Sequence, residues 1–190
     1  MQGKLIIFSA PSGSGKSTIV QWLMQEHPEL HLAFSISCTT RQPRGKERNG
    51  VEYIFLSLDD FKNKIDNNEF LEYEEVYKDR FYGTLKKQIE SQLKAGQNVI
   101  FDVDVKGGCN IKDYYKDKAL SVFVQPPSVE ELRRRLINRN TDTLEAIETR
   151  LKKAAEELTF ASKFDTIIVN NNLDKAKEET YNIIKNFLNH

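Results

Sequence analysis

The residues with the clearest chemical meaning lie in a loop rich in glycine and serine, SAPSGSGKST at residues 9–18, which follows an apolar run. Small residues let successive backbone N–H groups converge on phosphate oxygens, and a helix that begins near Lys16 adds the partial positive charge of its N-terminus. The Lys16 ammonium should reach the β- and γ-phosphates of a nucleoside triphosphate, and the Ser17 hydroxyl should bind Mg²⁺. We expect the triphosphate to be surrounded by Ala10, Pro11, Ser12, Gly13, Ser14, Gly15, Lys16, Ser17 and Thr18.

This loop departs from the pattern GxxxxGK[ST] at its first position, which is Ala10. The residues that carry the chemistry stand at its other end, at Gly15, Lys16 and Ser17. A second apolar run, at residues 99–102, ends in the carboxylate of Asp102. Carboxylates commonly hold Mg²⁺ directly or through its water shell, so we expect Asp102 to assist the metal through water.

A second group of cationic and phenolic side chains predicts a separate anion site. The stretch SISCTTRQPR at residues 35–44 contains Arg41 and Arg44 among several hydroxyl groups. Arginine matches a phosphate with two parallel hydrogen bonds, and Tyr53 and Tyr82 can add phenolic donors. Two anion sites in one chain favour transfer of a phosphoryl group between two phosphorylated ligands.

Three further arginines are candidates to gather charge around a transferring phosphoryl group. Arg135 and Arg139 stand four apart and share one face of an expected helix, while Arg150 lies just beyond the polar stretch at residues 138–143. That stretch is typical of the hinge of a lid, which would exclude water from the reaction. We therefore expect Lys16, Arg135, Arg139 and Arg150 to act in catalysis.

The elements that position these residues follow from short apolar runs at residues 5–8, 99–103, 120–124 and 166–169, with a fifth expected strand at 33–36. Apolar strands that alternate with helices are typical of a parallel sheet that is buried on both faces. The sequence predicts an α/β P-loop fold with three layers, a central five-stranded parallel sheet, a mixed α+β insertion and a small helical lid. In this single domain, we expect a core at about 1–37, 95–137 and 151–190, an insertion at about 38–94 and a lid at about 138–150. Within the insertion, residues 51–56 alternate like a half-exposed strand.

Composition narrows the classes of partner. The 190 residues contain 28 Lys and Arg against 28 Asp and Glu, so the formal net charge is zero. A nucleic-acid binder needs a surplus of positive charge to displace counterions, and no apolar run is long enough for a membrane span or a signal peptide. We expect a cytoplasmic protein that binds neither nucleic acid nor membrane. The sequence leaves open whether it is a monomer or a homodimer.

A regulatory GTPase is an alternative, since DVKG at residues 104–107 matches DxxG and NKID at residues 63–66 matches NKxD. In such GTPases NKxD follows DxxG along the chain, whereas here it precedes it. Moreover, Leu58, Phe61 and Ile65 recur at helical spacing after a Ser57 cap. This pattern is typical of a short surface helix, so we interpret NKID as a chance match.

Taken together, the motifs resemble those of guanylate kinases over essentially the whole chain. The most specific is TTRxPRxxExxGxxY at residues 39–53, accompanied by EFLEYEEVYKDRFYGT at 69–84, IFDVDVKG at 100–107 and LRRRLINRNTDT at 132–143. The resemblance implies that the GMP phosphate is held by Arg41, Arg44, Tyr53 and Tyr82, and that guanine is contacted by Ser37, Glu72 and Thr84, with help from Asp104. A carboxylate at Glu72 can accept from both N1–H and the exocyclic amine of guanine.

The resemblance also implies the roles of the remaining candidates. Arg135, Arg139 and Arg150 match arginines of the lid and of the catalytic centre, and Asn171 falls in a stretch that runs near the donor adenine. Asn171 is equally explained as part of a polar turn after the last strand. The implied reaction is Mg²⁺-assisted transfer from ATP to GMP in purine nucleotide metabolism. The alternative is a non-catalytic relative that uses the GMP pocket to bind a phosphopeptide or partner, but such modules typically lose the lysine that is present here as Lys16.

Overall fold

Within residues 2–138 and 143–189, which the computed structural model describes, a central sheet of five parallel strands has the order β2-β7-β1-β8-β9. Its strands are β1 (Leu5–Ser9), β2 (Leu32–Phe34), β7 (Asn98–Asp102), β8 (Ala119–Gln125) and β9 (Thr166–Val169). Phe8 pairs with Asp102 on one side and with Val122 on the other. The carboxyl ends of β1 and β7 therefore meet at one edge of the sheet, and the predicted five-stranded parallel sheet is confirmed.

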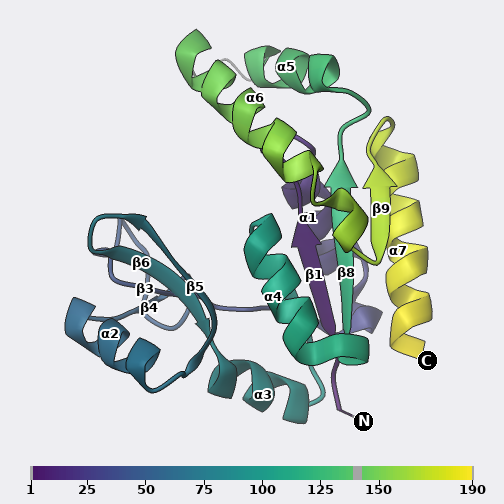
Figure 1. Ribbon diagram of the computed structural model, residues 1–190. Coiled ribbons are helices and arrows are strands. Elements are labelled where there is room, and N and C mark those ends of the chain that lie inside the picture. Colours follow the sequence, from purple (N-terminus) through teal and green to yellow (C-terminus); the bar gives the residue numbers. More distant parts are fainter. Residues whose placement is uncertain (1, 139–142, 190) are drawn as a thin grey trace.

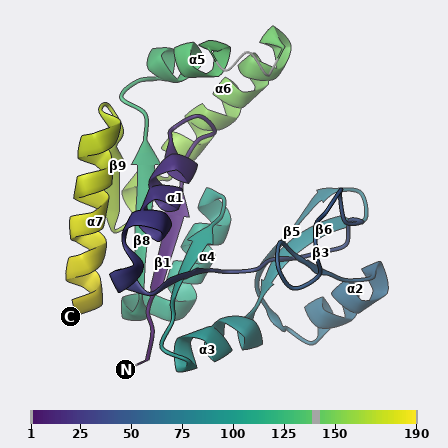
Figure 2. The same ribbon diagram turned by 180° about the vertical axis from the view of Figure 1, so that it is seen from behind.

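Helices cover both faces of this sheet (Figures 1 and 2). They are α1 (Lys16–Glu26), α3 (Lys86–Lys94), α4 (Val105–Tyr115) and α7 (Leu173–Asn189). Ile6 and Phe8 pack in the core formed with α1 and α7, whereas Leu5 and Ile7 pack in the core formed with α3 and α4. Successive side chains of a strand point to opposite faces, so β1 contributes to two separate cores. Short 3₁₀ turns are formed by η1 (Pro28–Leu30), η2 (Lys116–Lys118) and η3 (Ala161–Lys163).

A smaller sheet in the order β4-β3-β6-β5 stands to one side of α4 (Figure 1). Its elements are β3 (Cys38–Thr39), β4 (Ile54–Phe55), α2 (Leu58–Asp66), β5 (Phe70–Tyr77) and β6 (Arg80–Leu85). Phe61 from α2 stacks on Phe70 and closes a small separate core. The Ser57 hydroxyl caps α2 by accepting from the Asp60 N–H at 3.0 Å. NKID therefore lies in a capped surface helix, as the helical spacing predicted.

Two of the predicted strands differ in their limits. The strand expected at residues 33–36 begins earlier and ends at Phe34, and of the half-exposed strand expected at 51–56 only Ile54–Phe55 forms a ladder. Val51 lies in a turn after Gly50, whose φ is 80°, and its N–H bonds to the carbonyl of Arg48. The alternation of residue types there comes from a turn followed by a very short strand, which period-2 patterning does not distinguish from one longer strand.

Above the carboxyl ends of the strands, α5 (Val129–Asn138) and α6 (Leu144–Leu158) pack against each other (Figure 1). Leu132 and Leu136 on α5 meet Ile147 and Leu151 on α6. The Ser128 hydroxyl accepts from the Glu131 N–H, and the Thr143 hydroxyl caps α6. None of the helices in the described part of the chain is long and apolar enough to cross a membrane.

Candidate active site

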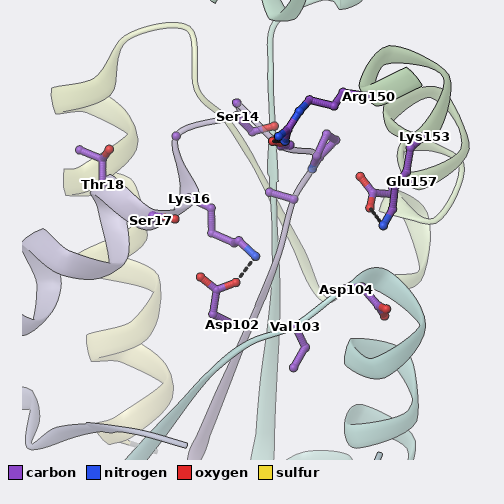
Figure 3. Close-up of a pocket in the computed structure, with 15 residues that line it drawn as sticks. Ser14, Lys16, Ser17, Thr18, Asp102, Val103, Asp104, Arg150, Lys153 and Glu157 are labelled. Atoms are coloured by element: carbon purple, nitrogen blue, oxygen red, sulfur yellow. Dashed lines mark hydrogen bonds and ion pairs between the residues drawn. The ribbon is translucent and has the colours of Figure 1, made fainter. Parts of the chain in front are cut away.

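The glycine-rich loop joins β1 to α1 and wraps one wall of a hollow of about 430 Å³ (Figure 3). Gly15 stands before the first residue of α1 with φ 92°, and Gly13 has φ 97°. A side chain disfavours this left-handed backbone, which explains why glycine occupies both turns. All nine predicted triphosphate contacts line the hollow, together with Asp102, Val103, Asp104, Arg150, Lys153 and Glu157.

Lys16 and Asp102 form an ion pair across this hollow (Figure 3). Asp102 is the last residue of β7, and the register with β1 carries it to the same edge as the loop. The Lys16 side chain is only 15% exposed, so its ammonium is largely shielded from solvent. The two residues predicted to serve the triphosphate and its metal are thus brought together by the parallel pairing of two strands.

Oxygen donors for a hard cation are present at this edge. The Ser17 hydroxyl and the Asp102 carboxylate line the same hollow. Across residues 2–138 and 143–189, no group of three or more His, Cys, Asp or Glu side chains is placed to hold a metal ion. The Ser17 hydroxyl and the Asp102 carboxylate fit Mg²⁺, which proteins commonly bind through one or two oxygen ligands while nucleotide phosphates and water supply the rest.

Helix α6 supplies the opposite wall of the hollow. The Arg150 guanidinium donates to the Ser12 hydroxyl at 2.8 Å, and thereby reaches the glycine-rich loop. Lys153 and Glu157 also line the hollow, although the sequence did not single them out. Burial raises the pKa of Glu157. Their spacing from Arg150, three and seven residues, places all three on one helical face, and this is the signal that could have identified them.

Arg135 lies outside this hollow, in a neighbouring one of about 530 Å³ on the other side of the loop. Its guanidinium donates to Glu131 at 2.9 Å and to the carbonyl of Asn170 at 2.8 Å. Asn171 lines the same hollow. Arg135 and Arg150 are therefore presented on two sides of the loop, and Arg139 lies outside the described residues.

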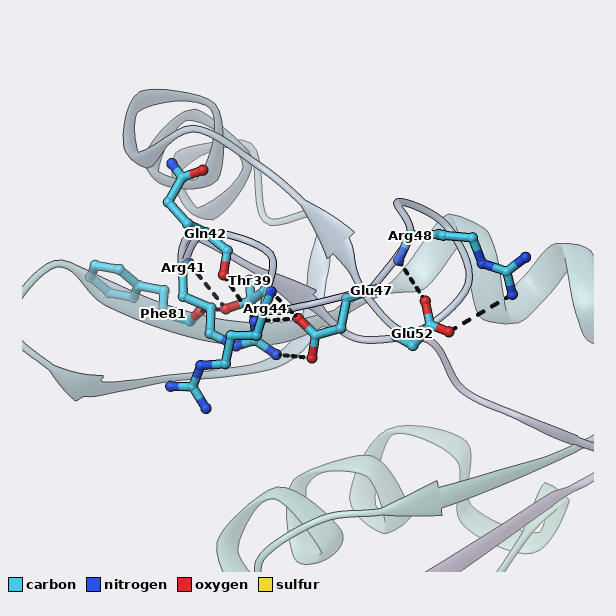
Figure 4. A network of polar contacts seen from close by, with 8 residues as sticks. All are labelled: Thr39, Arg41, Gln42, Arg44, Glu47, Arg48, Glu52 and Phe81. Atoms are coloured by element: carbon cyan, nitrogen blue, oxygen red, sulfur yellow. Dashed lines mark hydrogen bonds and ion pairs between the residues drawn. The ribbon is translucent and has the colours of Figure 1, made fainter.

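The second predicted anion site lies on the small sheet and is built around Arg41 (Figure 4). Glu47 accepts two hydrogen bonds from the Arg41 guanidinium, at 2.6 and 2.7 Å, and one from the Arg44 N–H at 2.7 Å. The hydrogen bonds from Arg41 lower the pKa of Glu47 to about 2. Sequence reasoning did not give Glu47 a role, although it is the glutamate of the TTRxPRxxExxGxxY pattern.

Tyr53 and Tyr82 complete this cluster. The Arg41 guanidinium lies 4.8 Å from the centre of the Tyr53 ring, and the rings of Tyr53 and Tyr82 are 5.9 Å apart. The hydrogen bonds to Glu47 raise the pKa of Arg41, and Tyr82 adds to the effect. Arg41 and Arg44 share a hollow of about 440 Å³ with Thr40, Gln42, Pro43, Lys78, Asp79 and Arg80.

Three of the residues expected to contact guanine, Glu72, Thr84 and Asp104, lie close together where the small sheet meets α4. Glu72 on β5 faces Thr84 on β6, and the buried Thr84 hydroxyl donates to the Glu72 carboxylate at 2.7 Å. Burial raises the pKa of Glu72, while the bond from Thr84 opposes that shift. Asp104 caps α4 by accepting from the Gly107 N–H at 2.7 Å, and its charge also raises the pKa of Glu72. Ser37 precedes β3, and its carbonyl accepts from the Ile54 N–H.

The predicted residues are therefore distributed over separate hollows. The loop, Asp102 and Arg150 line one, Arg135 and Asn171 line the second, and Arg41 and Arg44 line the third. The third belongs to the small sheet, which stands apart from the loop in both views (Figures 1 and 2). Each set of charges can thus bind an anion of its own.

Known proteins match the chain over nearly its whole length. The family model described as guanylate kinase matches residues 2–189. The guanylate kinase of Bacteroides thetaiotaomicron is 65% identical over 189 residues, covering 100% of this chain and 92% of that protein. The guanylate kinase of Porphyromonas gingivalis is 53% identical over 185 residues, covering 97% and 98% of the two chains.

A solved structure agrees with these sequence matches. The crystal structure of guanylate kinase from Anaplasma phagocytophilum superposes with a TM-score of 0.71 at 27% identity, covering 98% of this chain and 87% of that one. The resemblance first drawn from the motifs is confirmed by the family match, the sequence identities and the shared fold. The chain belongs to the guanylate kinase family.

Proposed function

We propose that the loop hollow and the Arg41 cluster of this chain hold the two substrates of one reaction, ATP + GMP → ADP + GDP. Membership of the family makes the chain an enzyme, a kinase that phosphorylates GMP with ATP. The observation that carries the assignment of catalysis to this site is the ion pair of Lys16 with Asp102, in the same hollow as Arg150. A non-catalytic binding module has no need to keep these charges together at a phosphate loop.

On the donor side, we assign residues 10–18 to the phosphates of ATP. Backbone N–H groups of the loop would receive the phosphate oxygens, and the Lys16 ammonium would neutralise charge at the β- and γ-phosphates. Arg150 already reaches the loop through Ser12, and would stabilise the transferring group from the opposite wall. Arg135 would approach from the other side, Arg139 would join from the lid, and Asn171 would lie near the donor base.

Ser17 and Asp102 would hold Mg²⁺, the latter through water. When bound, the ion neutralises negative charge on the donor phosphates. Asp102 is paired with Lys16 in the structure, so the carboxylate has an alternative cationic partner within the same hollow. Both partners stand at the C-terminal edge of the central sheet, where ligands of open α/β sheets bind.

On the acceptor side, Arg41, Arg44, Tyr53 and Tyr82 would hold the phosphate of GMP. For guanine, we assign Ser37, Glu72 and Thr84, with Asp104 nearby. The Glu72 carboxylate would accept from N1–H and the exocyclic amine, a pair of donors that adenine does not present together. Thr84 already orients Glu72 through a hydrogen bond, so little side-chain freedom would be lost on binding.

The chemical step would be an in-line displacement. An oxygen of the GMP phosphate forms a bond to the γ-phosphorus of ATP while the bond from that phosphorus to the bridging oxygen of ADP breaks. The acceptor oxygen is already ionised, so no general base is required. Positioning and charge neutralisation by Lys16 and the arginines would supply most of the catalysis.

Because the Arg41 cluster and the loop line separate hollows, we propose that the small sheet and a small helical lid close over bound substrates and exclude water. The moving parts correspond to an insertion at about 38–94 and a lid at about 138–150, around a core at about 1–37, 95–137 and 151–190. Ile89 and Leu93 of α3 pack in the core with Leu5, so within the insertion α3 would stay with the core during closure. We also propose that the enzyme works in the cytoplasm.

A coupled assay of ADP release with AMP, GMP, CMP, UMP and dTMP as acceptors tests the function. We expect turnover with GMP alone among the five. Turnover with another monophosphate at a similar rate would contradict the guanine site. Binding of GMP without any turnover would instead favour the binding module.

A further inference from the structure

Asn170 connects the phosphate loop to the rest of the core. It follows β9, is 4% exposed, and its N–H donates to the carbonyl of Gln125 at the end of β8 at 2.8 Å. Its side-chain amide donates to the carbonyl of Ser14 at 2.8 Å. Asn170 is thus anchored to the sheet by its backbone and binds one peptide group of the loop through its side chain.

That peptide group joins Ser14 to Gly15. No cis peptide bond occurs among the described residues, and in a planar trans peptide the C=O and the following N–H point in opposite directions. Asn170 holds the Ser14 carbonyl from the hollow that it lines with Arg135, and it does not line the loop hollow itself. The Gly15 N–H is therefore directed away from Asn170, and Gly15 also lines the hollow that contains Lys16.

From this geometry we infer that Asn170 is a positioning residue that aims the Gly15 N–H at the phosphates of the donor nucleotide. It acts through the peptide and does not touch the reacting atoms. The inference rests on the proposed function, because the donor phosphates are the anion that the N–H would meet. A free loop could rotate this peptide, since glycine accepts both signs of φ, so the hydrogen bond from Asn170 selects one orientation.

Two other contacts of Asn170 support this role. A Cβ added at Gly15 would lie 2.3 Å from the Asn170 side-chain nitrogen, so the amide packs directly on the turn that it holds. The Asn170 carbonyl meanwhile accepts from the Arg135 guanidinium. The loop and the Arg135 side chain are thus positioned against the same residue, and a shift of Asn170 would displace both.

The test compares N170D, N170A and the control N172D. The first change keeps the size of the side chain but replaces the donor by a carboxylate, which repels the Ser14 carbonyl. Asn172 undergoes the same chemical change two residues away, where its side-chain oxygen caps α7 by accepting from the Lys175 N–H and a carboxylate can do the same. Binding of ATP and of GMP is measured separately by calorimetry, with kcat and KM for each substrate and with thermal unfolding.

We expect N170D to weaken ATP binding by about tenfold or more, with a smaller loss for N170A. Binding of GMP should stay within about twofold in both, and N172D should match the unmodified chain for both ligands. If Asn170 only fills space, N170A should be the more damaging change, because it leaves a cavity. A larger loss of ATP binding in N170A than in N170D, or an equal loss of ATP and GMP binding, would overturn the inference.

Two further cases can be decided: one in which N170D does not fold, and one in which the proposed function fails while the positioning role holds. Should N170D fail to fold, N170A is compared with N172A, and a loss confined to ATP still supports the role while an equal loss of both ligands contradicts it. Should the unmodified chain bind ATP without phosphorylating GMP, a selective loss of ATP binding in N170D would support the positioning role although the proposed reaction had failed.

Discussion

Glu47 holds both terminal nitrogens of the Arg41 guanidinium, at 2.6 and 2.7 Å, and so fixes the plane in which that guanidinium can face an anion. The two residues are six apart, and the same carboxylate also receives the Arg44 N–H. One acidic side chain thus organises both arginines of the proposed acceptor site. This internal ion pair would preorganise the site for a phosphate.

Changing Glu47 to Gln should therefore weaken the acceptor site. The amide can accept from only one of the two nitrogens, so Arg41 loses its fixed orientation. We expect KM for GMP to rise by about tenfold, with KM for ATP little changed. Glu52→Gln is the matched control, because the Glu52 carboxylate lies in the same loop and accepts from the Arg48 N–H at 2.6 Å. Equal effects of the two changes on KM for GMP would contradict the role of Glu47.

Lys16→Ala should abolish turnover, with a loss of at least about 10³-fold in kcat, because the ammonium would neutralise charge that develops at the donor phosphates. The fold should be retained, since the side chain projects into the hollow and not into either core. Steady-state kinetics and thermal unfolding measure the two effects. Lys118→Ala, an exposed change in η2, should leave both unaltered. Substantial residual turnover in the Lys16 variant would count against the donor assignment.

Glu72→Gln should reduce the preference for GMP over other monophosphates by about 1–3 kcal/mol, because the amide can no longer accept twice from guanine. Competition between GMP and AMP in the ADP-release assay measures the preference. Unchanged discrimination would remove Glu72 from the guanine site.

The pH dependence of GMP binding provides a second test of Glu72. Burial raises its pKa above the ordinary value of 4.5, so protonation begins at a higher pH than for an exposed glutamate. Binding that needs the carboxylate is complete above this raised pKa and weakens as the pH falls through it. We expect KM for GMP to rise at acidic pH more steeply in the unmodified chain than in Glu72→Gln. The titration of the GMP phosphate is common to both proteins, so identical profiles would contradict this account.

A stability prediction concerns Asp165, away from the proposed site. Its carboxylate accepts at 2.8 Å from the Ser121 N–H, from the Ser121 hydroxyl and from the Lys112 ammonium. Burial opposes ionisation, but the bonds from Lys112 and Ser121 outweigh it and lower the pKa of Asp165 below 3.8. The native state therefore binds this proton more weakly than the unfolded chain. The stabilisation is present above pH 3.8 and is lost as the pH falls through the native pKa.

Asp165→Asn should accordingly lower the free energy of unfolding at neutral pH by about 1–2 kcal/mol, a value reduced by the partial exposure of the ion pair. Denaturant unfolding at neutral and acidic pH measures it, and the difference from the unmodified chain should shrink in acid. Asp117→Asn, an exposed change in η2, serves as the control. A difference that is independent of pH would show that the charge of Asp165 is not the cause.

Local sequence patterns were sufficient to predict the strands of the central sheet, the helix cap at Ser57 and the glycine-rich loop. Each of these depends on neighbours in the chain: a buried run for β1, a hydroxyl three residues before an N–H, and small residues before Lys16. The limits of the edge strands were less predictable. Only pairing decides where β2 ends, and the turn after Gly50 imitates the alternation of a strand.

Contacts between distant residues could not be predicted in this way. Asn170 and Ser14 are 156 positions apart, and nothing local to Asn170 indicates that its amide holds the loop. The sequence instead singled out Asn171, the adjacent residue of the same turn. The placement of Arg135 and Arg150 on opposite sides of the loop also depends on the packing of α5 against α6, which the spacing of arginines does not specify.

Because β1 contributes to two cores, the protein should be sensitive to the insertion or deletion of a residue in this strand. Inserting or deleting one residue within β1 would move the strand residues on one side of the change to the opposite face of the sheet, so both cores would be mispacked at once. It would also displace the start of the phosphate loop by one strand residue, about 3.3 Å. The packing of β1 on both faces of the sheet therefore fixes the register of the strand, and with it the position along the chain at which the phosphate loop begins.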